Sequence, residues 1–171
     1  IPNGRMFQEK IESSVKVQAI AVWHFDDLES YSSDYGYEFV DRLIVYMSSM
    51  LLKHLPPMTD LYRTEPNCFI YVANDKIAAV ELHQMLQEMS DCFKKGFKFE
   101  EHTILLQGVC VFDTSERITS LEELYLNAMA VLKHPSIEYR LNIVKYNPKI
   151  HIRNFTEELL EDMEEAMKNH D

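Results

Sequence analysis

The chain has 171 residues, of which 46% are hydrophobic and 26% charged, and its formal net charge is −11. This length and composition predict one globular domain, or one domain with a connecting helix, that is large enough to bury a core. Because 28 acidic residues outnumber 17 lysines and arginines, and no basic stripe runs along the chain, we expect no nucleic-acid partner.

The first part of the chain is predicted to contain three helical segments and a buried strand. A short helix is expected over residues 6–13. Residues 15–25 are β-branched and almost continuously apolar, which predicts a central strand buried on both faces. A short helical turn is expected over 27–33. An amphipathic helix follows over 38–54 and ends before two consecutive prolines.

A β-hairpin is predicted next, with strands over residues 61–64 and 69–72. Pro66 and Asn67 suit the two central positions of its turn. Proline presets φ, and asparagine tolerates positive φ, so this pair indicates a tight turn.

The second half of the chain alternates helices and strands. A helix is expected over 75–94, and a buried apolar strand over 102–112. A Ser-x-x-Glu capping box predicts the start of a helix over 120–133. A short strand over 142–146 and an acidic helix over 154–169 complete the order. A sheet built around a central hairpin, mainly antiparallel and flanked by helices, is an α+β fold of the ferredoxin-like type.

The three cysteines predict the cellular compartment. Cys68, Cys92 and Cys110 are odd in number, widely spaced and without a CxxC pair, which fits a reducing cytoplasm. No apolar run approaches the roughly 20 residues that a membrane span needs, and no signal peptide is recognisable. We therefore expect a cytoplasmic domain without membrane contact of its own, cut from a longer protein.

Six segments share the order and the spacing of motifs in a known family. They are IPNGRMF at 1–7, HFDDL at 24–28, DYGYEFVD at 34–41, RTEPNCF at 63–69, LQGV at 106–109 and NAMAVLK at 127–133. In the same order they resemble the motifs LPNRRxF, DIDxF, xYGHxxGD, RYGGDEF, SIGV and ADxALYxAK. Residues 1–148 thus resemble a GGDEF domain, the diguanylate cyclase fold of bacterial cyclic di-GMP signalling, and the resemblance implies a nucleotide-cyclase-like fold.

The departures from the family pattern fall on its metal site. Active relatives join two GTP molecules with the help of Mg²⁺ held on carboxylates, one from DIDxF and one from GGDEF. The matching positions here are His24 and Cys68, with Asn67 beside the latter. Because imidazole and thiol groups are poor magnesium ligands, we expect no catalytic residue, no metal site and no tightly bound Mg²⁺ or GTP.

The nucleotide site implied by the resemblance is also altered. Glu65 and Pro66 replace the two glycines, so that a negative side chain stands where phosphate would lie and one N–H donor is lost. In the family, an Asn and an Asp bind guanine. Ser32 and Asp41 occupy these two positions here, so only the Asp is retained. Lys133 matches a phosphate-contacting lysine. We expect a vestigial site with at most weak GTP binding.

Plainer interpretations of the same residues stay open. His24 fits a hydrogen-bonded histidine at a strand end, or, with Cys68, two of the four ligands of a softer ion such as zinc. Cys68 itself fits a small packed residue or a redox-active thiol. Asp26 and Asp27 look like a carboxylate pair for acid–base chemistry, although helix capping explains at least one of them.

Residues 149–171 resemble the acidic linker helix that joins GGDEF domains to EAL phosphodiesterase domains. The resemblance therefore implies a catalytically inactive GGDEF domain that acts as a regulatory or dimerisation module, as a homodimer or beside an EAL domain in the same chain. Two alternatives remain. One is a GTP-binding allosteric module that activates an adjacent phosphodiesterase domain, and the other is a residual diguanylate cyclase.

Overall fold

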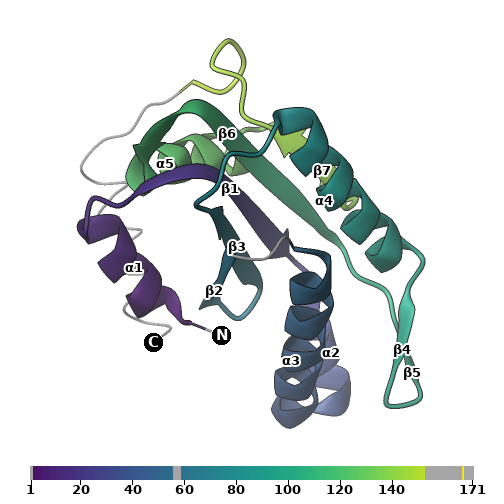
Figure 1. Cartoon of the computed structure of the whole chain (residues 1–171). Coiled ribbons are helices and arrows are strands. Elements are labelled where there is room, and N and C mark those ends of the chain that lie inside the picture. The colour runs from purple at the N-terminus through teal and green to yellow at the C-terminus, as the bar shows by residue number, and fades with distance from the viewer. Residues whose placement is uncertain (1, 56–58, 153–166, 168–171) are drawn as a thin grey trace.

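Figure 1 shows the computed structural model of the chain, which describes residues 2–55, 59–152 and 167. A central sheet has the strand order β2-β3-β1-β6-β7, and its neighbouring strands are antiparallel except for the parallel pair β6 and β7. Its strands are β1 (Lys16–Phe25), β2 (Thr59–Glu65), β3 (Cys68–Ala73), β6 (Gly108–Ser120) and β7 (Asn142–Lys145). The predicted mainly antiparallel α+β fold is confirmed.

Helices cover both faces of the sheet, which gives three layers (Figure 1). They are α1 (Gly4–Glu12), α2 (Leu28–Tyr35), α3 (Tyr37–His54), α4 (Ala79–Lys94) and α5 (Leu121–Leu132). α1 and α5 pack on one face, whereas α2, α3 and α4 pack on the other. The two apolar cores are therefore separated by the sheet.

Strand β1 contributes to both cores. Successive strand residues point to opposite faces. Accordingly, Trp23 and Phe25 pack in the core under α3 and α4, whereas Ile20 and Val22 pack in the core under α1 and α5. The strand is buried without a break from Val17 to Trp23, so the prediction of a buried central strand is confirmed.

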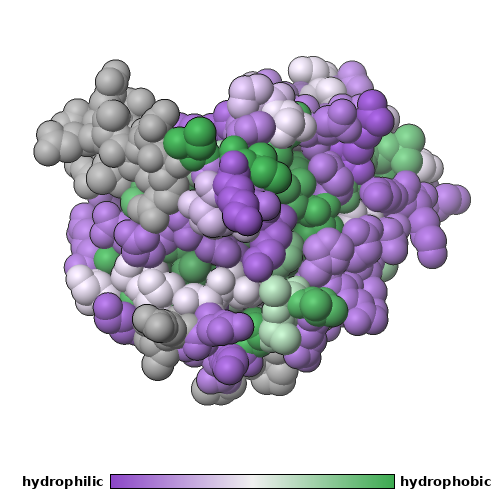
Figure 2. All heavy atoms as spheres, turned by 90° about the horizontal axis from the view of Figure 1, so that it is seen from above, coloured by the Kyte–Doolittle hydropathy of each residue, from purple (hydrophilic) through white to green (hydrophobic). Residues whose placement is uncertain are grey.

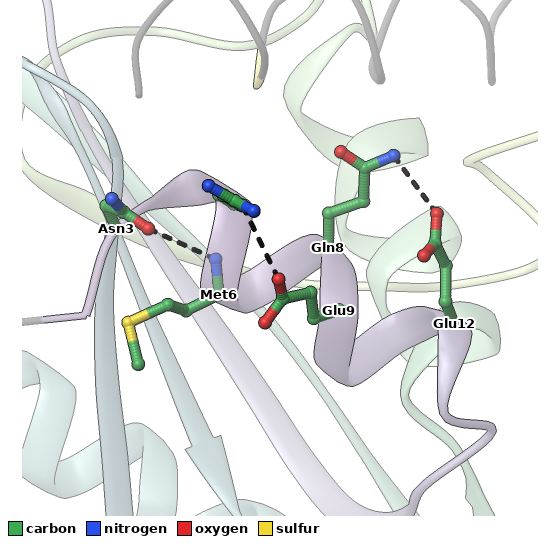
Figure 3. A network of polar contacts seen from close by, with 6 residues as sticks. Asn3, Met6, Gln8, Glu9 and Glu12 are labelled. Carbon is green, nitrogen blue, oxygen red and sulfur yellow. Dashed lines mark hydrogen bonds and ion pairs between the residues drawn. The ribbon is translucent and has the colours of Figure 1, made fainter.

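Helix α1 is anchored at its start by an asparagine cap. The Asn3 Oδ1 atom accepts a hydrogen bond from the Met6 N–H at 3.1 Å, which satisfies one of the free donors of the first turn (Figure 3). Further along the same helix, Gln8 donates to Glu12 at 3.2 Å (Figure 3). Asn3 also forms a β-bridge with Arg63 in β2, so the start of the chain lies beside the hairpin.

The prediction of one strand over 102–112 is wrong. A separate two-stranded ribbon of β4 (Phe97–Phe99) and β5 (His102–Ile104) comes first, and β6 begins only at Gly108. The turn of the ribbon is made by Glu100 and Glu101, whose φ angles are +50° and +70°. The helix expected from residue 75 likewise begins later, at Ala79.

Other local predictions are confirmed. The Ser120 hydroxyl accepts a hydrogen bond from the Glu123 N–H at 3.2 Å, so the capping box opens α5 as expected. The turn predicted over 27–33 is the two-turn helix α2. The helix expected over 154–169 lies outside the described residues except for Met167, which is buried in the core with α1 and α5.

The face of the molecule seen in Figure 2 is mostly hydrophilic. Figure 2, which views the molecule from above, shows hydrophilic residues over most of this face and hydrophobic atoms in small groups between them. Among the described helices, none combines the length and the apolar character that crossing a membrane requires.

Candidate functional site

A cavity of about 500 Å³ lies where the end of β1 meets α2, α3 and the β2–β3 turn. Its apolar lining comes from Phe25, Leu28, Val40 and Ile44, all of which are buried or nearly so. Its polar lining comes from Asp26, Glu29, Ser32, Tyr37, Asp41, Arg63, Glu65, Pro66 and Asn67. The cavity thus gathers six of the residues that the sequence singled out (Asp26, Ser32, Asp41, Glu65, Pro66 and Asn67), from the end of β1, from α2, from α3 and from the β2–β3 turn.

Gly36 places α2 and α3 around this cavity. It has φ +92° and ψ 163°, a conformation that is essentially limited to glycine, and it both ends α2 and begins α3. Its N–H donates to the Ser32 carbonyl at 2.9 Å. The sharp join allows Ser32 on one helix and Asp41 on the next to line the same space.

The β2–β3 turn forms another wall. Pro66 and Asn67 are its two central residues, as predicted. Asn67 does not use positive φ, however, because the non-glycine residues with positive φ in the described part of the chain lie elsewhere. A β-bulge between Arg63 and Glu65 instead adjusts the end of β2. The Asn67 carbonyl accepts a hydrogen bond from the Phe25 N–H at 2.9 Å and holds the turn against β1.

His24 and Cys68 are direct partners on β1 and β3, but neither lines the cavity. The half-buried His24 ring packs against Tyr139 with 5.8 Å between ring centroids, and the Asn67 Nδ2 atom lies 3.4 Å from its Nε2 atom. Its buried Nδ1 atom has no hydrogen-bond partner among the described residues. Burial lowers the pKa of His24, while the nearby Glu65 and Asp26 carboxylates oppose that effect.

Cys68 is a buried thiol in the core under α1 and α5. It is 7% exposed, and burial raises its pKa to about 12 against the smaller opposing effect of a hydrogen bond with Thr64. A thiol held protonated is a poor nucleophile and a poor metal ligand. Within the described ranges, no group of three or more His, Cys, Asp or Glu side chains could hold a metal ion. The burial of Cys68 therefore favours the interpretation of Cys68 as a small packed residue over zinc binding or redox chemistry.

Asp26 and Asp27 do not act as a pair. Asp26 lines the cavity, whereas the Asp27 Oδ1 atom accepts a hydrogen bond from the Gln107 N–H at 3.1 Å. Asp27 stands at the N-cap position of α2 but makes no side-chain capping bond, so it does not cap α2 in the expected manner. Burial raises the pKa of Asp27, with the Gln107 N–H opposing that rise.

Lys133 lies away from the cavity. It is exposed at the C-cap of α5 and does not contribute to the lining. The loop that follows turns back over the core under α1 and α5, where Ile137 and Tyr139 pack. The structure therefore gathers Ser32, Asp41 and the β2–β3 turn at one site and leaves Lys133 outside it.

The sequence analysis assigned no role to Arg63, which lines the cavity, or to Tyr139, which contacts His24 outside it. Arg63 lines the cavity and is half-buried. Burial lowers the pKa of Arg63, and the charge of Asp41 acts in the opposite direction. The motif at 63–69 contained Arg63, so a signal existed, whereas nothing local indicated that Tyr139 would reach His24.

No protein-family model matches the sequence, and no curated protein matches it. Solved structures do. The GGDEF domain of DgcB from Caulobacter crescentus, in complex with c-di-GMP, is 14% identical with a TM-score of 0.68, over 84% of this chain and 90% of that chain. The GGDEF domain of TpbB (YfiN) from Pseudomonas aeruginosa is 9% identical with a TM-score of 0.69, over 94% and 95%. An EAL/GGDEF domain protein from M. capsulatus is 16% identical with a TM-score of 0.67, over 84% and 98%.

These similarities show the fold. The chain has a GGDEF-like fold, as the six sequence motifs implied.

Proposed function

We propose that this chain is a catalytically inactive GGDEF domain that acts as a regulatory or dimerisation module in bacterial cyclic di-GMP signalling. The observation that carries the proposal is the chemistry of two facing residues. His24 and Cys68 are partners on adjacent strands, at the two positions that the resemblance assigns to metal-binding carboxylates. They offer a nitrogen and a buried thiol instead of oxygen ligands.

These residues do not fit Mg²⁺. Magnesium prefers oxygen ligands in octahedral geometry, usually carboxylates, waters and substrate phosphates. The Cys68 thiol stays protonated, and the His24 ring is engaged with Tyr139 and Asn67. Synthesis of cyclic di-GMP at this site would therefore lack the charge neutralisation that the triphosphate requires.

The turn that would meet the phosphates is equally unsuited. Glu65 brings a carboxylate to the cavity wall, and Pro66 has no N–H to donate to an anion. The Asn67 amide nitrogen lies 3.4 Å from the His24 Nε2 atom, so one of its two N–H donors is directed at that ring. Repulsion and missing donors both act against a bound triphosphate.

A domain that does not catalyse cyclic di-GMP synthesis can still regulate a neighbouring domain. Two of the similar solved structures are described as an EAL/GGDEF domain protein and as a diguanylate cyclase/phosphodiesterase, so domains of this fold occur in composite proteins. We place this chain in the cytoplasm, beside an EAL-type domain or in a homodimer, where its conformation would influence a catalytic neighbour.

The test is a cyclase assay on the purified chain with GTP and either Mg²⁺ or Mn²⁺, with product measured by mass spectrometry. We expect no cyclic di-GMP above the level of a no-enzyme control, while an active diguanylate cyclase in the same buffer forms product. Product that appears with this chain and disappears in Asp26→Asn would refute the proposal.

A second candidate is a GTP-binding allosteric module. It is favoured by Ser32 and Asp41, which line one cavity although they lie on different helices. Because Glu65 and Pro66 oppose the phosphates, we expect a GTP dissociation constant no tighter than roughly the high micromolar range. A sub-micromolar constant by isothermal titration calorimetry, weakened in Asp41→Ala, would make this candidate the preferred one.

A further inference from the structure

We infer that the cavity beside the β2–β3 turn binds an organic cation that carries an amidinium or guanidinium group and no phosphate. The inference rests on the proposed function, because it takes the cavity to be free of nucleotide turnover. The cavity itself, and not only its charge, carries the argument.

The charge of the lining selects for a cation. The lining contains four residues with a carboxylate (Asp26, Glu29, Asp41 and Glu65) and one with a guanidinium, Arg63, so its formal charge is −3 from four negative groups and one positive group. A cleft lined by one sign of charge with low-dielectric walls concentrates ligands of the opposite sign. A triphosphate is therefore repelled, and a cation is attracted.

The apolar part of the lining, which forms the floor of the cavity, favours a ligand with an apolar portion. Phe25, Leu28, Val40 and Ile44 are buried beneath the carboxylates, and the volume of about 500 Å³ is in the range of small-molecule sites. A bare metal ion would make no apolar contact with this floor, and the described residues contain no group of three or more side chains that could hold a metal ion. A flat or slender organic cation can cover the floor and place its charge at the rim.

The hydrogen-bonding groups point to the same ligand class. Carboxylates pair with planar amidinium and guanidinium groups through two parallel hydrogen bonds. On the turn side of the cavity, Glu65 supplies an acceptor, Pro66 has no N–H, and the Asn67 amide nitrogen is beside His24. The turn therefore offers acceptors to a cationic donor and little to an anion.

The exposed Tyr37 ring supports this assignment. Tyr37 lines the cavity and is 81% exposed, so its ring is accessible at the entrance. A guanidinium or amidinium over a tyrosine face gains a cation–π attraction. Two sources share this chemistry: a small free cation with an aromatic or aliphatic body, and an arginine side chain of a partner protein.

The experiment is a titration of the ¹⁵N-labelled chain, followed by its amide NMR spectrum, with four probes. Benzamidine represents a small aromatic cation, and N-acetyl-arginine methylamide represents a protein arginine. Benzamide is the uncharged near-isostere of benzamidine, and guanosine represents a retained nucleobase site. We expect benzamidine or the capped arginine to shift the amides of residues around the cavity and to bind at least about tenfold more tightly than benzamide.

Variants in which one carboxylate is replaced by an amide test whether benzamidine binds in the cavity. Asp41→Asn should weaken benzamidine binding about fivefold, since a charge pair at 4 Å in water is worth about 1 kcal/mol. Asp34→Asn is the matched control: Asp34 is exposed on α2 and does not line the cavity, so the same change of charge there should alter binding less than about twofold. The amide spectra of both variants also report whether the fold is intact.

The tighter of the two cations identifies the source of the ligand, and either result supports the inference. Equal binding of benzamidine and benzamide, tighter binding of guanosine than of both cations, or equal effects of the two variants would overturn it. The cyclase assay fails or succeeds independently of these titrations. Product formation would refute the proposed function, whereas loss of charge selectivity would refute only the ligand class.

Discussion

Replacing Cys68 with glutamate would place the acidic residue of the GGDEF motif at this position, yet we expect it to destabilise the domain. Cys68 is 7% exposed in the core under α1 and α5, and burial raises its pKa from 9.0 to about 12. A glutamate carboxylate at this place loses the same hydration. A rise of the same size in its pKa corresponds to about 4 kcal/mol of lost stability once the carboxylate is ionised.

The pH dependence separates this effect from the loss of packing. The pKa of the buried glutamate in the folded state would lie above its value of about 4.3 in the unfolded chain. Cys68→Gln is the neutral variant of matched size. Relative to it, Cys68→Glu therefore keeps its full stability below the unfolded pKa of about 4.3 and loses stability as the pH rises through the folded pKa. We expect a small difference at pH 5 and about 4 kcal/mol at pH 8.

Urea unfolding followed by fluorescence of the one tryptophan, the buried Trp23, measures both variants. Asn67→Glu is the control, because Asn67 is the neighbouring residue but is half-buried and lines the cavity. Its cost should stay below about 1 kcal/mol. Equal free energies of unfolding for Cys68→Glu and Cys68→Gln at both pH values, or an equal loss in Asn67→Glu, would contradict the reasoning.

Two further predictions concern the junction of β1 and β6 and the neighbouring histidine. Gly108→Ala should lower the free energy of unfolding by about 1–3 kcal/mol, because a Cβ atom there would lie 2.5 Å from the His24 carbonyl oxygen. An unchanged urea midpoint would contradict this prediction, because it would mean that β1 and β6 move apart at no cost in free energy. Because burial lowers the pKa of His24, the folded state prefers the neutral ring, so this contribution to stability is present above about pH 6.5 and lost as the pH falls through the folded pKa. His24→Gln should therefore show a smaller fall in Tm between pH 7.5 and pH 5.5 than the unmodified chain, and parallel curves would refute the assignment.

The elements with local signals could be predicted from the sequence. The turn at Pro66 and Asn67, the cap at Ser120 and the buried strand β1 each depend on residues that are close together in the chain. The ribbon of β4 and β5 could not be predicted in this way. It is held by distant contacts: Arg42 on α3 donates to both carboxylate oxygens of Glu100 at 2.7 and 2.9 Å, and the Tyr31 hydroxyl bonds to the backbone of Leu105.

The membership of the candidate site was only partly predictable for a similar reason. Spacing along the motifs grouped Ser32, Asp41 and Glu65, and these three residues line one cavity. His24 and Lys133 do not line this cavity. Spacing alone reports neither the direction of a strand side chain such as His24 nor the position of the C-cap of α5, where Lys133 lies. The contact between His24 and Tyr139 depends on the path of the loop after α5, for which the sequence gives no local signal.

The alternation of β1 has a consequence for how such a domain can change over time. Phe25 forms part of the cavity, whereas His24, one residue earlier, lies beside Tyr139 outside it. Two neighbouring residues of β1 thus lie in different surroundings, although Asn67 lines the cavity and also contacts His24. Substitutions around His24 need not alter the shape of the cavity that Phe25 lines. A domain with this alternation can change the residues on one side of β1 and still keep a cavity for a ligand on the other.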